Sequence, residues 1–122
     1  MALWREANKD DLPRIYNKLK EMREYSHAPQ MKWADEDIAW RALIHNVENK
    51  RVYIVGDFAV MADWGYPFWY SEKIALIEDF VLRVGRHNGN PLSDVPKALE
   101  EIAKSKGIDV VITGDAQGGQ VD

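Results

Sequence analysis

The chain of 122 residues has the length of one domain, and its 46% hydrophobic and 30% charged residues are those of an ordinary globular protein. The net charge of −4 argues against a nucleic-acid or anionic-membrane partner. The absence of cysteine excludes disulfides, thiolate metal sites and cysteine nucleophiles. We therefore expect a single cytoplasmic domain over residues 1–122, with no leader peptide and no membrane span.

The first half of the chain has the pattern of one short strand followed by two helices. Residues 2–7 alternate weakly and predict the strand. Asp10 is a natural N-cap and Pro13 suits a first helical turn, so the apolar residues at helical spacing predict an amphipathic helix over 12–26. A second apolar stripe predicts a helix over 33–49, with carboxylates in its first turn.

The second half begins with three predicted strands. The β-branched stretch 51–57 and the stretch 58–64 flank Gly56-Asp57, so we expect them to form a hairpin. A strand over 73–82 follows. We then expect a helix over 91–106 and a nearly all-apolar strand over 108–113, of the kind that is buried on both faces. This order, β-α-α-β-β-β-α-β, predicts an α/β (α+β) fold with a mixed sheet and helices on both faces.

The loop between the third predicted strand and the last helix is rich in glycine and cations. Arg83, Arg86 and His87 accompany Gly85 and Gly89 there. A strand, a glycine-containing loop and a helix N-terminus can together hold a phosphate, because unpaired N–H groups and the helix dipole favour negative charge. A solvated turn explains the same residues, and both interpretations stay open.

These residues in this order resemble the GCN5-related N-acetyltransferase (GNAT) superfamily. WREANKDDLPRIYNKLKEM resembles its first strand and helix, and KIALIEDFVL resembles its fourth strand. Residues 86–91, RHNGNP, resemble its coenzyme A motif, Gln/Arg-x-x-Gly-x-Gly/Ala, and LEEIAKSKGIDVVITGD resembles the following helix end and fifth strand. Within the superfamily the chain is most similar to small, divergent proteins encoded by bacteriophages.

The resemblance implies a GNAT-like, mostly antiparallel sheet and an acetyltransferase that passes the acetyl group of acetyl-CoA to an amine. It implies Glu78 as general base, with a strand-end carboxylate in an ion pair as the alternative. The cosubstrate-binding residues that it implies are Phe80, Val81 and Leu82 for the pantetheine arm, and Arg86, His87, Gly89 and Asn90 for the phosphates. The histidines are not spaced as metal ligands, so no metal is expected.

The chain also departs from the family pattern. Pro91 replaces a small residue and removes one backbone donor. The family's fourth helix, with its general-acid tyrosine, and its last two strands are missing after residue 113, so we expect a truncated or shortened fold. An exposed fifth strand, or the aromatic cluster at 64–70, could then contact another copy or a protein partner. The cluster could equally be a hairpin that packs on the helices.

The departures leave two alternatives to an active enzyme. One is a catalytically degenerate structural or interaction protein of viral (phage) origin, in the host cytoplasm or the virion. The other is a regulator that binds coenzyme A without turnover.

Overall fold

The computed structural model describes residues 3–25, 35–66, 72–86 and 89–113. They form a five-stranded sheet in the order β1-β2-β3-β4-β5, antiparallel except for the parallel pair β4–β5. The elements are β1 (Arg5–Glu6), η1 (Lys9–Asp11), α1 (Leu12–Tyr25), α3 (Glu36–Glu48), β2 (Val52–Val55), β3 (Phe58–Gly65), β4 (Ala75–Arg83), α4 (Asp94–Ser105) and β5 (Val110–Ile112). The predicted element order and mixed sheet are confirmed.

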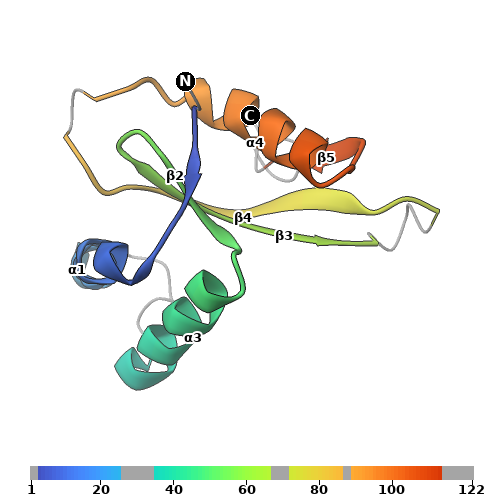
Figure 1. Cartoon of the computed structure of the whole chain (residues 1–122). Coiled ribbons are helices and arrows are strands. Elements are labelled where there is room, and N and C mark those ends of the chain that lie inside the picture. Colours follow the sequence, from blue (N-terminus) through green and yellow to red (C-terminus); the bar gives the residue numbers. More distant parts are fainter. Residues whose placement is uncertain (1–2, 26–34, 67–71, 87–88, 114–122) are drawn as a thin grey trace.

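The sheet separates two hydrophobic cores, so the molecule has three layers (Figure 1). Helix α4 buries its apolar stripe, which includes Val95, Leu99 and Ile102, on one face of the sheet. Helices α1 and α3 cover the other face with side chains such as Ile15 and Leu43. Successive strand residues alternate between the two cores because side chains on a strand have a period of two.

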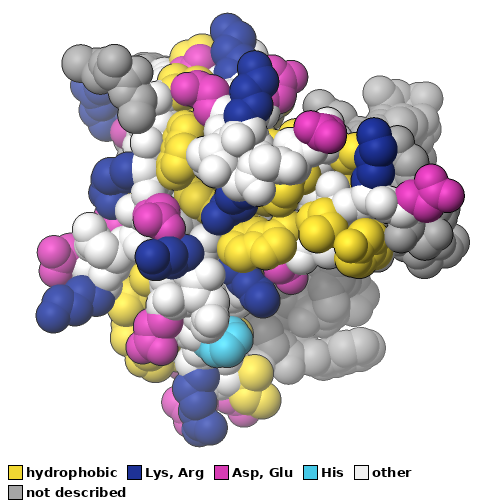
Figure 2. Space-filling view, turned by 45° about the vertical axis from the view of Figure 1, so that its right-hand side comes forward, with side chains coloured by type: hydrophobic (Ala, Val, Ile, Leu, Met, Phe, Trp, Pro, Cys, Tyr) yellow, Lys and Arg dark blue, Asp and Glu magenta, His cyan; other side chains and the backbone are white. Residues whose placement is uncertain are grey.

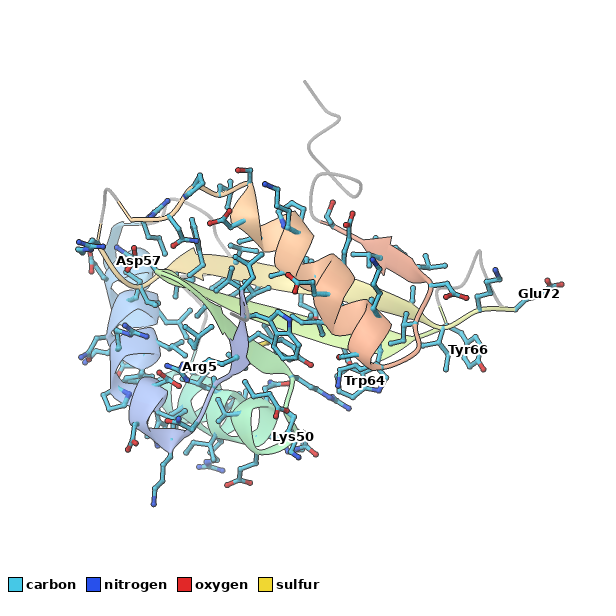
Figure 3. All side chains as sticks on the ribbon, turned by 45° about the horizontal axis from the view of Figure 1, so that its top comes forward. Arg5, Lys50, Asp57, Trp64, Tyr66 and Glu72 are labelled. Atoms are coloured by element: carbon cyan, nitrogen blue, oxygen red, sulfur yellow. The ribbon has the colours of Figure 1, made fainter. Side chains whose placement is uncertain are left out.

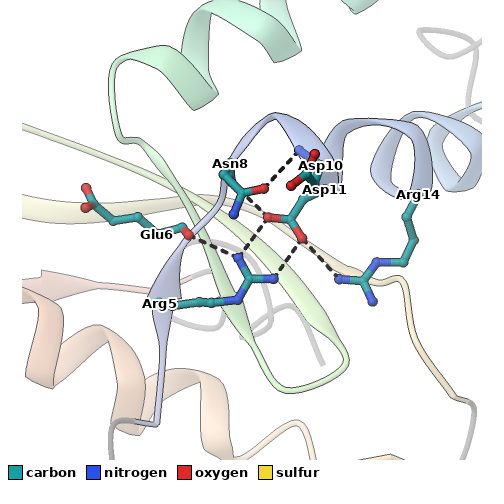
Figure 4. A network of polar contacts seen from close by, with 6 residues as sticks. All are labelled: Arg5, Glu6, Asn8, Asp10, Asp11 and Arg14. Carbon is teal, nitrogen blue, oxygen red and sulfur yellow. Dashed lines mark hydrogen bonds and ion pairs between the residues drawn. The ribbon is translucent and has the colours of Figure 1, made fainter.

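A polar network connects β1 to the start of the first helix (Figure 4). Asp11 is buried, and its two oxygens accept hydrogen bonds from the Arg5 guanidinium at 2.8 and 2.9 Å. Asn8 caps the helix by accepting from the Asp10 N–H, and Asp11 in turn accepts from the Asn8 N–H at 2.8 Å. The prediction that Asp10 is the cap was therefore wrong. The hydrogen bond from Arg5 lowers the pKa of Asp11, opposed by burial.

The ends of the strands show two further differences from the sequence-based expectation. Strand β5 is half-buried and short, because it lies at the edge of the described sheet and pairs with β4 alone; it is not buried on both faces. Of the predicted aromatic cluster, Trp64 packs against the α4 core and Tyr66 is exposed, while residues 67–70 lie outside the described ranges.

The surface carries charges of both signs. Figure 2 shows Lys and Arg side chains interspersed with Asp and Glu over the described part of one face. Within the described ranges, no helix is long and apolar enough to cross a bilayer. The same residues contain no cluster of three or more histidines and carboxylates that could hold a metal ion.

Candidate functional site

Strand β4 has an irregularity in its pairing with β3 just beyond the point where its described pairing with β5 ends. Its parallel pairing with β5 covers only Ala75–Ile77 of β4, although β4 continues to Arg83. On its other side, the register with β3 shifts between Met61 and Ala62, which face Phe80 and Glu78. Asp79 is thus the extra residue of a β-bulge, and backbone groups at a bulge are released from the hydrogen-bond ladder.

The bulge also changes which side chains face α4. Leu76 and Val81 both pack in the α4 core, although their positions differ by an odd number, whereas Phe80 packs in the α1/α3 core. On a regular strand, residues 78 and 81 would point to opposite faces. Because Asp79 is inserted between them, Glu78 and Val81 line the same groove.

That groove, hereafter the β4–α4 groove, lies between the middle of β4, Thr113 after β5, and the start of α4. Its volume is about 380 Å³, within the usual range for small-molecule sites. Its lining residues are Glu78, Val81, Leu92, Ser93, Val95, Pro96 and Thr113. The walls are therefore mostly apolar, and a carboxylate and two hydroxyls are the polar groups among the lining side chains.

The second carboxylate of the acidic pair has a different environment. Asp79 is exposed, and burial of part of the side chain raises its pKa. The neighbouring carboxylate of Asp63 raises it further, and Arg51 opposes the shift. Adjacent in sequence, Glu78 lines the groove and Asp79 does not.

The loop that follows β4 is fastened to the β2–β3 turn by Asn90. The Asn90 Oδ1 accepts a hydrogen bond from the Asp57 N–H at 2.7 Å. Its Nδ2 donates to the Val55 carbonyl and to the Asp94 carboxylate, both at 3.2 Å. Gly56 has φ +60°, and a Cβ there would overlap the Asn90 amide. Only glycine therefore suits position 56 on both counts.

Asp57 completes this arrangement from the opposite direction. Its carbonyl accepts from the N–H groups of Val84 and Gly85 at 2.8 and 3.0 Å. Its carboxylate occupies the space into which a Cβ of Gly85 or Gly89 would project. We call the turn residues Gly56 and Asp57, together with Gly85, Gly89 and Asn90 of the loop, the clasp; the label of Asp57 marks its place in Figure 3.

Arg83 holds the same loop from the end of β4. Its guanidinium donates to the carbonyls of Arg86 and Asn90 at 3.2 and 3.1 Å. It also lies 4.2 Å above the ring of Phe58, a cation–π contact. This predicted phosphate-loop cation is thus a structural contact of the loop.

The predicted site residues lie in three parts of the structure: the groove, the opposite face of the sheet, and the loop with its clasp. Glu78 and Val81 lie in the groove, while Phe80 and Leu82 pack on the opposite face and are not among its lining residues. Gly89 and Asn90 belong to the clasp, Arg86 is exposed, and His87 lies outside the described ranges. Sequence reasoning missed the bulge and the groove residues Ser93 and Thr113, for which no local pattern gives a signal.

Comparison with known proteins supports the fold. No family model and no curated protein matches this sequence. The structure is similar to the crystal structure of a predicted acetyltransferase with acetyl-CoA from Clostridium acetobutylicum, with a TM-score of 0.59 and 12% sequence identity. The match covers 93% of this chain and 80% of that chain. At this identity the likeness shows a shared fold, the mixed, mostly antiparallel acetyltransferase-type sheet.

Proposed function

We propose that this protein is an acetyl-CoA-dependent N-acetyltransferase whose acyl donor binds in the β4–α4 groove. One observation carries the proposal: a bulge at Asp79 interrupts the ladder between β3 and β4, beside a groove lined by the Glu78 carboxylate. A bound acetyl-CoA supplies an activated acetyl thioester. The mostly apolar groove suits the pantetheine arm, and the backbone of the bulge residue Asp79 can supply a hydrogen-bonding group next to it.

The residues around the opening have the properties that acetyl transfer needs. Backbone N–H groups held at the bulge can stabilise negative charge that develops on the thioester carbonyl oxygen. Glu78 can accept the proton that the amine loses as its nitrogen bonds to the carbonyl carbon. The carbon–sulfur bond then breaks, and the thiolate departs. The similar fold of a protein crystallised with acetyl-CoA supports this assignment.

Calorimetry with a groove-blocking variant tests the proposal. Ser93 is exposed at the groove, so Ser93→Trp fills the groove without disturbing the core. Glu101→Trp, at an exposed position of the same helix, is the matched control. We expect acetyl-CoA to bind the wild type and the control alike, and Ser93→Trp to weaken binding at least about tenfold, a loss of about 1.4 kcal/mol. No binding to the wild type at high micromolar ligand would contradict the proposal.

A thiol-release assay with a panel of amines separates turnover from binding. Release of free thiol that depends on an amine supports the enzyme. Binding without release for every amine would favour a second candidate, a non-catalytic interaction protein. The half-buried edge strand β5 and exposed Tyr66 favour that candidate, because edge strands and aromatic side chains are common protein contacts.

A further inference from the structure

We propose that this chain recognises its acyl donor through the pantetheine thioester arm and not through the nucleotide diphosphate. The inference rests on the proposed function and concerns which part of the donor supplies affinity. It follows from the start of α4 and from the clasp, where several of the described groups that could hold a diphosphate are already used by the chain itself.

The N-terminus of α4 has few donors left for an anion. An anion at a helix N-terminus is held by the N–H groups of the first turn. Here the Asp94 N–H donates to the Pro91 carbonyl at 3.1 Å, and the Val95 N–H donates to the Leu92 carbonyl at 3.0 Å. The third position is Pro96, which has no N–H. The Asp94 carboxylate also lies in this turn and already interacts with the helix dipole.

The glycine loop before the helix is filled by the chain's own side chains. Glycines near a phosphate usually allow the backbone to approach it closely. In this loop the space beside Gly85 and Gly89 contains the Asp57 carboxylate. The N–H groups of Gly85 and Gly89 donate to the Asp57 and Arg86 carbonyls, both at 3.0 Å. Asp57 thus accounts for both glycines without any ligand.

The charges around the clasp also disfavour a diphosphate. The Asp57 carboxylate lies beside Gly85 and Gly89, and the Asp94 carboxylate accepts from Asn90; both would repel an anion at short range. The Arg83 guanidinium is committed to loop carbonyls and to Phe58. Arg86 is exposed, and exposed ionic contacts contribute little because water and salt screen them.

The groove, in contrast, offers an arm-sized site that the clasp does not obstruct. Val81, Leu92 and Val95 supply apolar walls, and Ser93 and Thr113 supply hydroxyls that can bond the amides of the arm. Affinity should therefore reside in the part of the donor that all pantetheine thioesters share.

Calorimetric titration with acetyl-CoA and acetyl-pantetheine tests this inference on the whole chain. We expect the two dissociation constants to agree within about threefold, because a charge-assisted contact to the diphosphate would add about tenfold or more. Adenosine 3′,5′-bisphosphate, the nucleotide part alone, should not displace acetyl-pantetheine. Raising salt about sixfold should change the acetyl-CoA dissociation constant less than about twofold.

Three results would overturn the inference while leaving the proposed function intact. They are acetyl-CoA binding more than about tenfold tighter than acetyl-pantetheine, displacement by the bisphosphate, and an Arg86→Ala variant that loses acetyl-CoA affinity alone by a similar factor. Failure of both thioesters to bind would overturn the proposed function, and this inference with it. The outcomes therefore separate the two proposals.

Discussion

The polar groups at the two ends of the β4–α4 connection have different surroundings. At the clasp, hydrogen bonds join Asn90, Asp57 and the strand end into one closed set. At the groove, Asp79 bulges out of the ladder between β3 and β4, and a carboxylate and two hydroxyls line the cavity. Polar groups that bond one another stabilise a fold, whereas polar groups that line a cavity can also contact a ligand. The glycine-rich motif therefore has a structural role, and the groove beside the bulge is where we propose the acyl donor to bind.

The largest expected effect is at the open end. Glu78→Gln keeps the shape of the side chain but removes its basicity, so turnover should fall about 10²–10⁴-fold while acetyl-CoA affinity changes less than about threefold. Asp79→Asn is the matched control, because Asp79 is the adjacent carboxylate and does not line the groove. Thiol-release kinetics and calorimetry measure the two quantities. A Glu78→Gln variant with wild-type turnover would show that Glu78 is not the general base.

The next largest effect is a loss of stability when the clasp is disrupted at the β2–β3 turn. Gly56→Ala should lower the free energy of unfolding by about 3 kcal/mol, because a left-handed φ disfavours alanine and the Asn90 amide must move. Gly107→Ala controls for φ alone, since Gly107 has φ +70° and open space; its loss should be about 1–2 kcal/mol. Urea denaturation compares them. Equal losses would show that the contact with Asn90 contributes nothing.

A smaller effect follows from removing the amide itself. Asn90→Ala leaves the Asp57 N–H and the Val55 carbonyl without their side-chain partner, so unfolding should become easier by about 2 kcal/mol. Asn46→Ala is the control, because its amide bonds only the Ala42 carbonyl on a helix surface, and its change should stay within about 0.5 kcal/mol. If the two variants unfold at the same urea concentration, the clasp is not a stabilising structure.

The smallest expected effect concerns two carboxylates, the ion-paired Asp11 and the exposed Asp79 at the bulge. The pKa of Asp11 is lowered in the folded state, so its contribution is present above the ordinary value of 3.8 and is lost as pH falls through the folded pKa. Asp11→Asn should therefore destabilise by about 1–2 kcal/mol at neutral pH and less in strong acid. The pKa of Asp79 is raised, so Asp79→Asn should stabilise slightly at neutral pH and lose that effect below 3.8. Urea titrations at both pH values check the opposite signs.

The fold could be predicted from the sequence because its elements are defined by local patterns. The stripe of α4 and the hairpin at Gly56-Asp57 are where the periodicity and turn residues place them. The cap of the first helix was misplaced by two residues, because Asn8 and Asp10 are both good caps. The contact that distinguishes them is tertiary, between Arg5 and Asp11.

The site was harder to predict, because it depends on pairing between strands. The bulge arises from the register of β4 against β3, and no residue type within β4 predicts it. The glycines at 85 and 89 predicted close approach of a phosphate, and in the structure a carboxylate of the chain itself lies beside them. Sequence alone could not show that this is the Asp57 carboxylate, which lies on a turn far away along the chain.

Methyl NMR tests most directly whether the groove binds the donor. When acetyl-CoA is added to methyl-labelled protein, we expect the methyl resonances of Val81, Leu92 and Val95, which line the groove, to shift. The methyls of Leu43 and Val47, in the core on the other face of the sheet, should stay unchanged. Shifts confined to Leu43 and Val47, or no shifts at saturating acetyl-CoA, would contradict the assignment of the β4–α4 groove as the acyl-donor site.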